Sequence, residues 1–440
     1  MLRWPVIAIV AILSIALLQW MTQPGNGIPA PVFAMEQPTF GPTSYADLLR
    51  NSKNRLDQSQ ARIVRAPNEW LRHAGAGAAA LSLFRLTGDI AYLDIAQTRI
   101  TAVRDLAPHP SGVPELRAEL ALARHDLAVA ARELEIFARS SVAPEKSALS
   151  EATAMRGDLA LYTGNHGKAE KLYRKAAQFD PHISVTLRQA NLKRVSGQFD
   201  AAIATLAGAT RAERHSPVVL SGIALQTGVI ASARGDYAAA ADWYDQAETL
   251  FSGHWLTALY RAEADLANGR TNSALTDLER LARDHGRPEA MDMLALVWRV
   301  RGDNARSRYW AMQAGAIWRE WSGKYPAAFA AHAAEHELVF GDAGEALRLA
   351  RINAKARPYG EARLLLARAL MANDQASAAL TEITLAEQSG WRSAQLYANK
   401  AQALTILGDS DAAETADEQA RAINPKINDP ATRLIWLAHG

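Results

Sequence analysis

Small and apolar residues alternate with polar ones at helical spacing over the segment Met155–Pro181. Ala169, Tyr173 and Ala176 fall at i, i+4 and i+7, so they share one face of a helix. Gly164 and the asparagine after it predict a tight turn before that helix, and the proline ends it because proline cannot continue a helix. The segment therefore predicts two short helices packed against each other.

This pattern recurs along the chain. Positions equivalent to the turn at Gly164 are spaced 33–39 residues apart and fall at Gly88, His125, Gly164, Gly197, Gly235, Gly269, Gly302, Gly341, Asp374 and Gly408. A small residue usually stands seven positions before the turn, as Gly157 does, and another five positions after it. An alanine-rich chain would fill some of these positions by chance, but it would not place glycine at eight of ten turns. The chain is therefore a series of repeats.

Proline closes three of the units at the same offset, seventeen residues after the turn, at Pro181, Pro358 and Pro425. The order of glycine, alanine, tyrosine, alanine and proline within about 34 residues resembles the tetratricopeptide repeat (TPR). The resemblance covers about residues 70–425. It implies an all-α fold, a right-handed α-solenoid of about ten TPR-like helix hairpins with capping helices, because each hairpin buries its apolar face only against its neighbours.

The pattern also divides the chain into segments. We expect an N-terminal transmembrane anchor or signal peptide at 1–21, a Pro/Gly-rich linker at 22–42, an N-terminal capping helix at 43–69, degenerate TPR-like hairpins at 70–146, the TPR array at 147–427 and a C-terminal capping helix at 428–440. Ser44 and Asp47 form a variant of the capping box, which predicts a helix from there to about Arg65. The second helix of the seventh unit is expected to run long, up to the break at Pro326.

The N-terminus contains a strongly apolar run, Val6–Leu18, flanked by Trp4 and Trp20. Such a run is either the core of a cleaved signal peptide or an uncleaved anchor, and the paired tryptophans favour the anchor. Arg3 precedes the run and no Lys or Arg follows until Arg50. Because positive charge stays on the cytoplasmic side, we expect an inner-membrane protein with a single span and a periplasmic C-terminal domain. After signal cleavage the chain would instead be periplasmic or secreted.

Composition agrees with packed helices and excludes several chemistries. Hydrophobic residues make up 49% of the chain but aromatic residues only 7%, and alanine favours helices over strands. The net charge of +2 gives no overall field for nucleic acid. Cysteine is absent, which excludes disulfides and thiolate chemistry. We expect protein partners, with no nucleic acid, no small-molecule substrate and no cofactor.

A polar stripe in the fourth unit is the first candidate binding face. In TPR proteins the first helices of the hairpins line a concave groove, which here corresponds to positions about three, six and ten residues before each turn. Arg188, Asn191 and Arg194 lie along such a helix side. They resemble the basic and amide residues with which some relatives grip a carboxylate, an acceptor that suits arginine. The alternative is a solvated basic face. Arg299 and Arg368 are isolated analogues in other units, so no carboxylate-clamp specificity is inferred.

The segment His332–His336 reads H-x-x-E-H, the inverted zinc-protease motif. Two histidines at i and i+4 could hold zinc, with Glu335 as general base. However, Ala334 is a repeat-packing position, and no downstream residue has the signature of a third ligand. The packing interpretation is therefore preferred, with no catalytic or metal-binding residue expected. A zinc-dependent hydrolase remains the enzymatic alternative.

Aromatic residues are densest around the seventh unit, at Trp298, Tyr309, Trp310, Trp318, Trp321 and Tyr325. Aromatics at helical spacing are expected to fill the gap between long helices, and exposed members would form a contact for a partner. Together these features predict a protein–protein interaction scaffold or assembly factor in the bacterial cell envelope, binding a partner peptide or helix in the concave groove. The alternative outside enzymology is a structural subunit of a larger membrane complex.

Overall fold

The computed structural model of the chain describes residues 33, 35, 38, 40–107, 113–212 and 215–436. The expected anchor or signal peptide and most of the linker lie outside these residues. None of the helices in the described part is long and apolar enough to cross a membrane.

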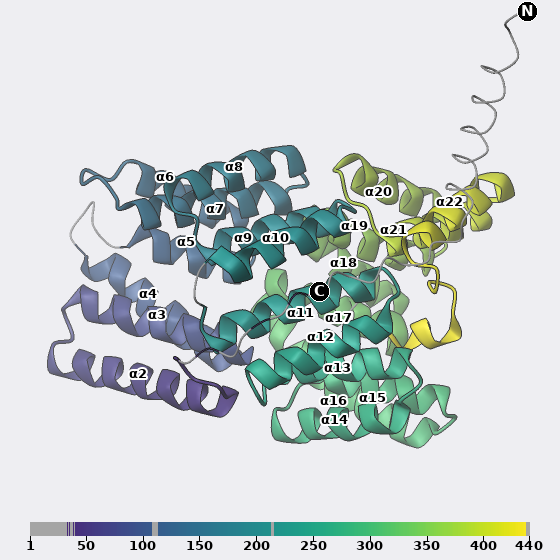
Figure 1. Ribbon diagram of the computed structural model, residues 1–440, viewed down its shortest axis with the longest axis horizontal. Coiled ribbons are helices and arrows are strands. Elements are labelled where there is room, and N and C mark those ends of the chain that lie inside the picture. Colours follow the sequence, from purple (N-terminus) through teal and green to yellow (C-terminus); the bar gives the residue numbers. More distant parts are fainter. Residues whose placement is uncertain are drawn as a thin grey trace, which may run out of the picture. The chain divides into compact units, whose positions relative to one another are not determined.

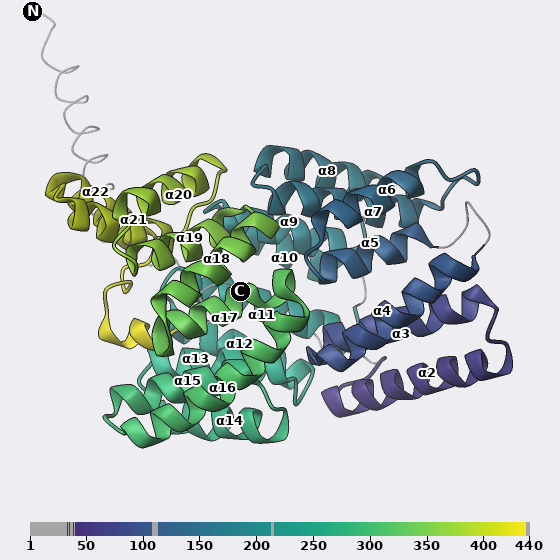
Figure 2. The same ribbon diagram turned by 180° about the vertical axis from the view of Figure 1, so that it is seen from behind.

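The described chain is all-α, as the repeat pattern predicts. The first helix is α2 (Tyr45–Arg65), and its N-cap Ser44 accepts a hydrogen bond from the Asp47 backbone N–H at 3.2 Å. Ten helix hairpins follow, each turning at a predicted position (Figures 1 and 2). They are α3 (Trp70–Thr87) with α4 (Ile90–Leu106), α5 (Pro114–Ala123) with α6 (Leu127–Ala138), α7 (Lys146–Tyr162) with α8 (His166–Phe179), α9 (Ile183–Val195) with α10 (Phe199–Ala212), α11 (Pro217–Ala233) with α12 (Tyr237–Leu250), α13 (Trp255–Ala267) with α14 (Thr271–Asp284), α15 (Pro288–Val300) with α16 (Asn304–Lys324), α17 (Pro326–Phe340) with α18 (Ala343–Ala356), α19 (Gly360–Met371) with α20 (Ala376–Gln388), and α21 (Ala394–Leu407) with α22 (Ser410–Ile423).

In two hairpins, a glycine of the first helix leaves room for the ring of a tyrosine from the second helix. A Cβ at Gly157 would overlap the ring of Tyr173, and a Cβ at Gly228 would overlap the ring of Tyr244. In the α7/α8 hairpin the hydroxyl of Ser150 donates to a carbonyl of the second helix at 2.9 Å, and the α11/α12 hairpin repeats this bond at the same separation. The small residues of the sequence pattern therefore set the distance between paired helices.

The turn positions share a left-handed backbone. Nine of the ten predicted positions have positive φ, including His125 at 57° and Asp374 at 58°. Gly341 is the exception, with φ −122°. Because L side chains reach this region only at a cost, glycine is favoured wherever the turn requires it. The two non-glycine positions in the repeat alignment are thus true equivalents of the glycine turns.

The solenoid winds tightly enough that distant hairpins meet. Turns of the first five hairpins contact the chain where the hairpin six places later begins, or, for the fifth, where the chain leaves α22. We call these five contacts the seam. At the first and second turns, Arg287 Nη1 donates to the Thr87 carbonyl at 3.1 Å, and His125 Nδ1 lies 3.0 Å from the Ala327 carbonyl oxygen. At the other three, Gly164 lies against the carbonyl of Pro358, the Arg392 backbone N–H donates to the Val195 carbonyl at 2.8 Å, and Asn424 Nδ2 donates to the Tyr237 hydroxyl at 3.1 Å.

The two ends of the array differ. Helix α2 packs on α3, as expected of a capping helix, and the Tyr45 backbone N–H donates to the Ser252 carbonyl beyond α12 at 2.8 Å. A C-terminal capping helix was the expectation for 428–440, but the described residues there form only a short 3₁₀ helix, η1 (Pro430–Leu434). This segment turns back from α22, its 3₁₀ helix packs against α13 and α15, and Trp436 stacks on Phe340 at the end of α17.

The tryptophan-rich unit fills space between long helices, in line with the sequence interpretation. Helix α16 runs to Lys324, just before Pro326. Trp318 is buried and donates from Nε1 to Asp292 Oδ2 at 2.7 Å. In contrast, Tyr309 is 53% exposed on the outer surface of the same helix.

Candidate functional site: the central cavity

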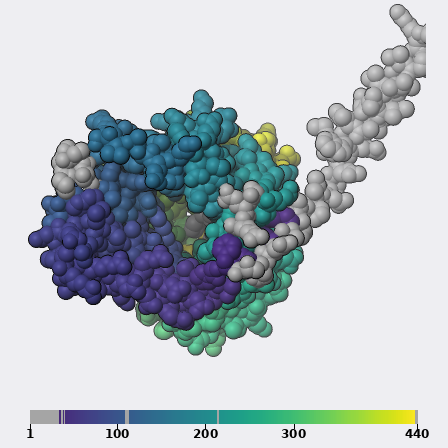
Figure 3. All heavy atoms as spheres, turned by 60° about the vertical axis from the view of Figure 1, so that its left-hand side comes forward, coloured from purple at the N-terminus to yellow at the C-terminus, as the bar shows by residue number. Residues whose placement is uncertain are grey.

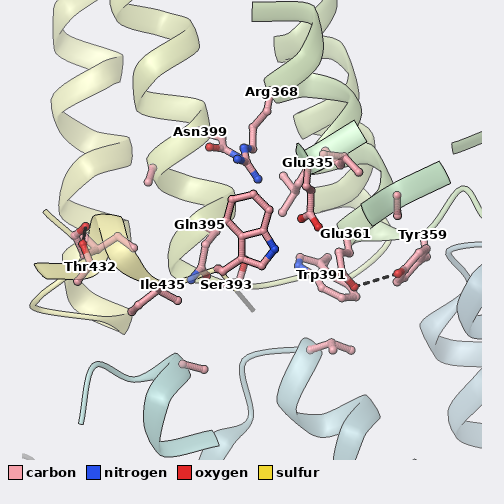
Figure 4. Close-up of a pocket in the computed structure, with 18 of the residues that line it drawn as sticks. Glu335, Tyr359, Glu361, Arg368, Trp391, Ser393, Gln395, Asn399, Thr432 and Ile435 are labelled. Carbon is pink, nitrogen blue, oxygen red and sulfur yellow. Dashed lines mark hydrogen bonds between the residues drawn. The ribbon is translucent and has the colours of Figure 1, made fainter. Parts of the chain in front are cut away.

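A cavity of about 710 Å³ lies inside the solenoid. Figure 3 shows a hollow ringed by the early hairpins, with later hairpins visible through it. The cavity wall comes from α9, α17, α18, α19 and α21 and from the C-terminal segment after α22. In Figure 4, Arg368 and Asn399 lie near each other, and Thr432 and Ile435 border the side away from Tyr359. The volume falls within the range of about 300–1,000 Å³ typical of ligand pockets.

The charged residues of the cavity wall are mostly basic. The arginines are Arg194, Arg357, Arg368, Arg392 and Arg433, and the carboxylates are Glu335 and Glu361. Amide side chains add further donors, among them Gln395 and Asn399. Because the chain as a whole is close to neutral, this excess of cations is a local property of the cavity.

Arg357 is the most enclosed of these cations. Its side chain is 8% exposed, and its guanidinium lies over the rings of Tyr162 and Tyr359, at 5.4 and 5.1 Å from their centroids. Nη2 donates to Asn353 Oδ1 at 3.2 Å, but Nε has no hydrogen-bond partner among the described residues. The rings hold the planar guanidinium in place and leave one donor without an acceptor.

Trp391 provides a second donor of this kind. The residue is 7% exposed, its ring meets that of Tyr359 edge to face at 5.7 Å, and a Cβ on Gly360 would overlap its indole. The indole Nε1–H has no acceptor within the described structure. Arg357 and Trp391 therefore contact the same tyrosine, and each offers a buried donor that lacks a partner. Leaving such a group unsatisfied costs about 1–3 kcal/mol.

A second cavity of about 420 Å³ adjoins the first, because His125 and His332 line both. Its wall carries Glu119, Glu151 and Asp158 together with Arg188. Burial, assisted by the charge of Arg357, lowers the pKa of His125 to about 3, so this imidazole is neutral near pH 7. The interior of the solenoid is thus basic in the larger cavity and richer in carboxylates in the smaller one.

Comparison with known proteins agrees with the repeat architecture. The tetratricopeptide repeat family model matches residues 150–183, which cover α8 and most of α7. Eight of the other nine described hairpins repeat its left-handed turn, and all nine repeat its helix pairing. The chain is a TPR protein. The crystal structure of yeast Tom70 is similar in fold, with 16% sequence identity over 88% of this chain and 91% of that chain and a TM-score of 0.42. No match is found among curated proteins.

The predicted stripe of this TPR protein is divided between the two cavities. Arg188 faces the smaller one, where it pairs with Glu151 at 2.6 Å and Asp158 at 3.0 Å. Arg194 lines the larger one and donates to Asn191 Oδ1 at 2.9 Å. Their common helix side therefore does not form a single basic face, and a partner-binding role for them remains a prediction.

The two isolated candidates also separate. Arg368 lines the central cavity (Figure 4), whereas Arg299 donates to the Val339 carbonyl at 2.8 Å and lies over the ring of Phe340. The pattern missed Arg357 and Trp391, because both stand where the chain enters a hairpin and not on the groove-facing side of a first helix. The Arg357–Pro358 pair was the available local signal, since it marks such a junction.

The H-x-x-E-H segment is part of the packing between α16 and α17. His336 Nδ1 lies 2.6 Å from Asp292 Oδ1, and a Cβ on Gly315 would meet this imidazole at 2.7 Å. The ring of His332 stacks on Trp318 with centroids 5.1 Å apart. Across the described residues, no group of three His, Asp or Glu side chains is arranged to hold a metal ion. These contacts place both histidines in the packing between helices, as the packing interpretation expects.

Proposed function

We propose that this TPR protein is an interaction scaffold whose central cavity binds a carboxylate-bearing segment of a partner protein. The observation that carries the proposal is the pair of buried donors without acceptors, Arg357 Nε and Trp391 Nε1. A carboxylate has two acceptor oxygens and suits a guanidinium, so it would satisfy both requirements together. The surrounding arginines would offset its charge.

A peptide segment agrees with the size of the interior. The larger cavity alone has the volume of a drug-sized ligand, and the adjoining cavity extends it by about 420 Å³. Since the tyrosine rings already fix Arg357, little side-chain entropy would be lost on binding. A partner would then be recognised through one terminal or side-chain carboxylate in the cavity and through neighbouring residues along the solenoid.

A peptide library tests this proposal directly. Peptides of matched sequence with a free or an amidated C-terminus, and with or without acidic side chains, are measured against the wild-type chain and Arg357→Gln. We expect carboxylate-dependent binding that falls about 10- to 100-fold in the variant, as for loss of a charged hydrogen bond of ~1.5–3 kcal/mol. Arg283→Gln is the control, because Arg283 forms an exposed pair with Glu279 in α14.

The proposal is contradicted if binding does not depend on the carboxylate of the peptide. It is also contradicted if Arg357→Gln and Arg283→Gln lose affinity equally. Arg368→Gln is the second cavity variant and guards against a folding defect. Arg368 is exposed and lines the cavity, whereas Arg357 is buried against two tyrosine rings.

We further propose that the scaffold works at the bacterial cell envelope, outside the inner membrane. The apolar run Val6–Leu18 and the absence of Lys and Arg between Arg3 and Arg50 support this location. Intact-mass measurement of the chain purified from membranes tests it. A mass that includes residue 1 favours the anchor, and cleavage after the run favours a periplasmic protein. Recovery in the cytosolic fraction alone would contradict both.

A further inference from the structure

The C-terminal segment Asn424–Trp436 behaves as a peptide lying in the groove of its own solenoid. It leaves α22, returns across the inner wall and borders the central cavity through Ile427, Thr432, Arg433, Ile435 and Trp436. Its 3₁₀ helix contains no buried residue, and none of residues 425–435 is fully buried. Full burial within the segment is therefore confined to its two ends, Asn424 and Trp436.

The first fastening is Asn424, which is 1% exposed and donates to the Tyr237 hydroxyl at 3.1 Å. The second is Trp436, whose indole stacks on Phe340 with centroids 5.8 Å apart. The backbone N–H of Trp436 donates to Glu263 Oε1 at 2.6 Å in a buried contact. Arg299 covers the ring of Phe340 at 4.3 Å, so Trp436 and Arg299 both contact this phenylalanine.

These contacts have the chemistry of peptide recognition. A carboxylate that accepts a hydrogen bond from a backbone N–H can bind any residue, whatever its side chain. A ring that stacks on the bound residue, in contrast, requires a flat, bulky side chain there. The wall formed by Glu263 of α13 and Phe340 of α17 thus suits a peptide segment with one aromatic anchor. The chain's own segment meets this requirement through Trp436.

We propose that this wall is a docking surface for a partner peptide segment with an aromatic anchor, and that residues 424–436 occupy it until such a segment replaces them. The inference rests on the proposed scaffold function, and it deepens that function by naming a second recognition element beside the carboxylate. Displacement would also remove one wall of the central cavity, so the two elements would be engaged by the same partner.

The chain's own sequence supplies the probe. A labelled, C-terminally amidated peptide of residues 424–436 is titrated into the full-length wild-type chain and into full-length Trp436→Ala. In the wild type the attached segment competes at an effective concentration in the millimolar range, whereas in the variant its anchor is missing. We expect the peptide to bind Trp436→Ala about tenfold or more tightly than the wild type. The same peptide with alanine in place of its tryptophan is the matched control and should bind neither chain.

Equal binding of the peptide to the two chains, or no binding to a folded Trp436→Ala chain, would overturn the proposal. Thermal melting establishes that the variant is folded. If it is not, Trp436→Phe keeps a ring on Phe340 and the same titration is made with it, with tighter binding than wild type again required. This test uses no carboxylate peptide, so it can fail while the carboxylate proposal stands, and the reverse also holds.

Discussion

The turns of the first five hairpins and those of the last five use glycine for different reasons. Gly88 and Gly235 have positive φ, and a Cβ on either would collide with Arg287 or Asn424 across the seam. Gly269, Gly302 and Gly408 have the same backbone, but a Cβ on any of them would meet nothing within 4 Å. At these five turns the backbone conformation requires glycine in both halves, and a steric requirement is added where the solenoid touches its next turn.

The largest effect is expected from breaking the seam at Arg287. This side chain is 5% exposed, pairs with Glu289 at 2.6 Å, and lies 3.9 Å over the ring of Trp255. Arg287→Ala leaves the buried Glu289 carboxylate without its partner, so we expect a loss of about 3–5 kcal/mol in the free energy of unfolding. Denaturant unfolding measures it. Arg283→Ala, in an exposed pair, should cost less than about 1 kcal/mol, and similar losses in both variants would refute the seam's importance.

Alanine at the two classes of turn sharpens the comparison. Gly269→Ala should cost about 1–2 kcal/mol, the penalty for an L-residue in the left-handed region. Gly235→Ala should cost about 1–3 kcal/mol more, because its Cβ also meets Asn424. Adding Asn424→Ala to Gly235→Ala should recover part of that excess, which a double-mutant cycle detects. Equal costs at Gly235 and Gly269 would show that the seam adjusts freely.

Acid should weaken the contacts around the seam. Burial lowers the pKa of His125 to about 3 and, together with the charge of Arg392, that of His166 to about 4. The unfolded chain takes up these protons near pH 6.5, so stability is full above pH 6.5 and is lost as pH falls towards 3–4. At pH 4.5, we expect His125 alone to account for about 2–3 kcal/mol.

His125→Asn is the variant for this measurement. Asparagine tolerates positive φ and can donate to the Ala327 carbonyl, yet it does not titrate. The free energy of unfolding measured between pH 7 and 4.5 should fall less steeply in the variant than in the wild type. An unchanged pH dependence would exclude His125 as a source of the acid sensitivity.

The smallest effect has the opposite sign. Asp374 occupies a turn of the second half with φ 58°. Asp374→Gly relieves that backbone and should stabilise the chain by about 0.5–1 kcal/mol. His125→Gly at the corresponding turn of the first half should give no such gain, since it also loses the bond to Ala327. Thermal melting of the two variants measures both effects. A gain in both would contradict a stabilising role for the contact between His125 and Ala327.

The repeated features of the fold could be predicted, because the same residue pattern recurs in each unit. The turns at His125 and Asp374 were identified without glycine, from spacing alone, and the length of α16 followed from Pro326. The direction of the C-terminal segment was not predicted, since it depends on Phe340, a residue in a distant helix.

The site was predicted only in part for the same reason. Arg188 reads as an available cation in sequence, but Glu151 and Asp158 reach it from the preceding hairpin. Arg357 and Trp391 become neighbours through Tyr359, and the seam then closes the space around them. Contacts that occur once leave no periodic signal, so repeat alignment finds the scaffold and overlooks the cavity.

The seam limits how this protein could change in length during evolution. An open array of hairpins can gain or lose a unit at any point, because each unit contacts only its neighbours. Here, a hairpin inserted between Gly235 and Arg287 would shift every seam partner by one place and match each of the five turns with the wrong junction. Duplication of a single repeat is therefore least tolerated in that stretch, where one insertion would disrupt all five contacts.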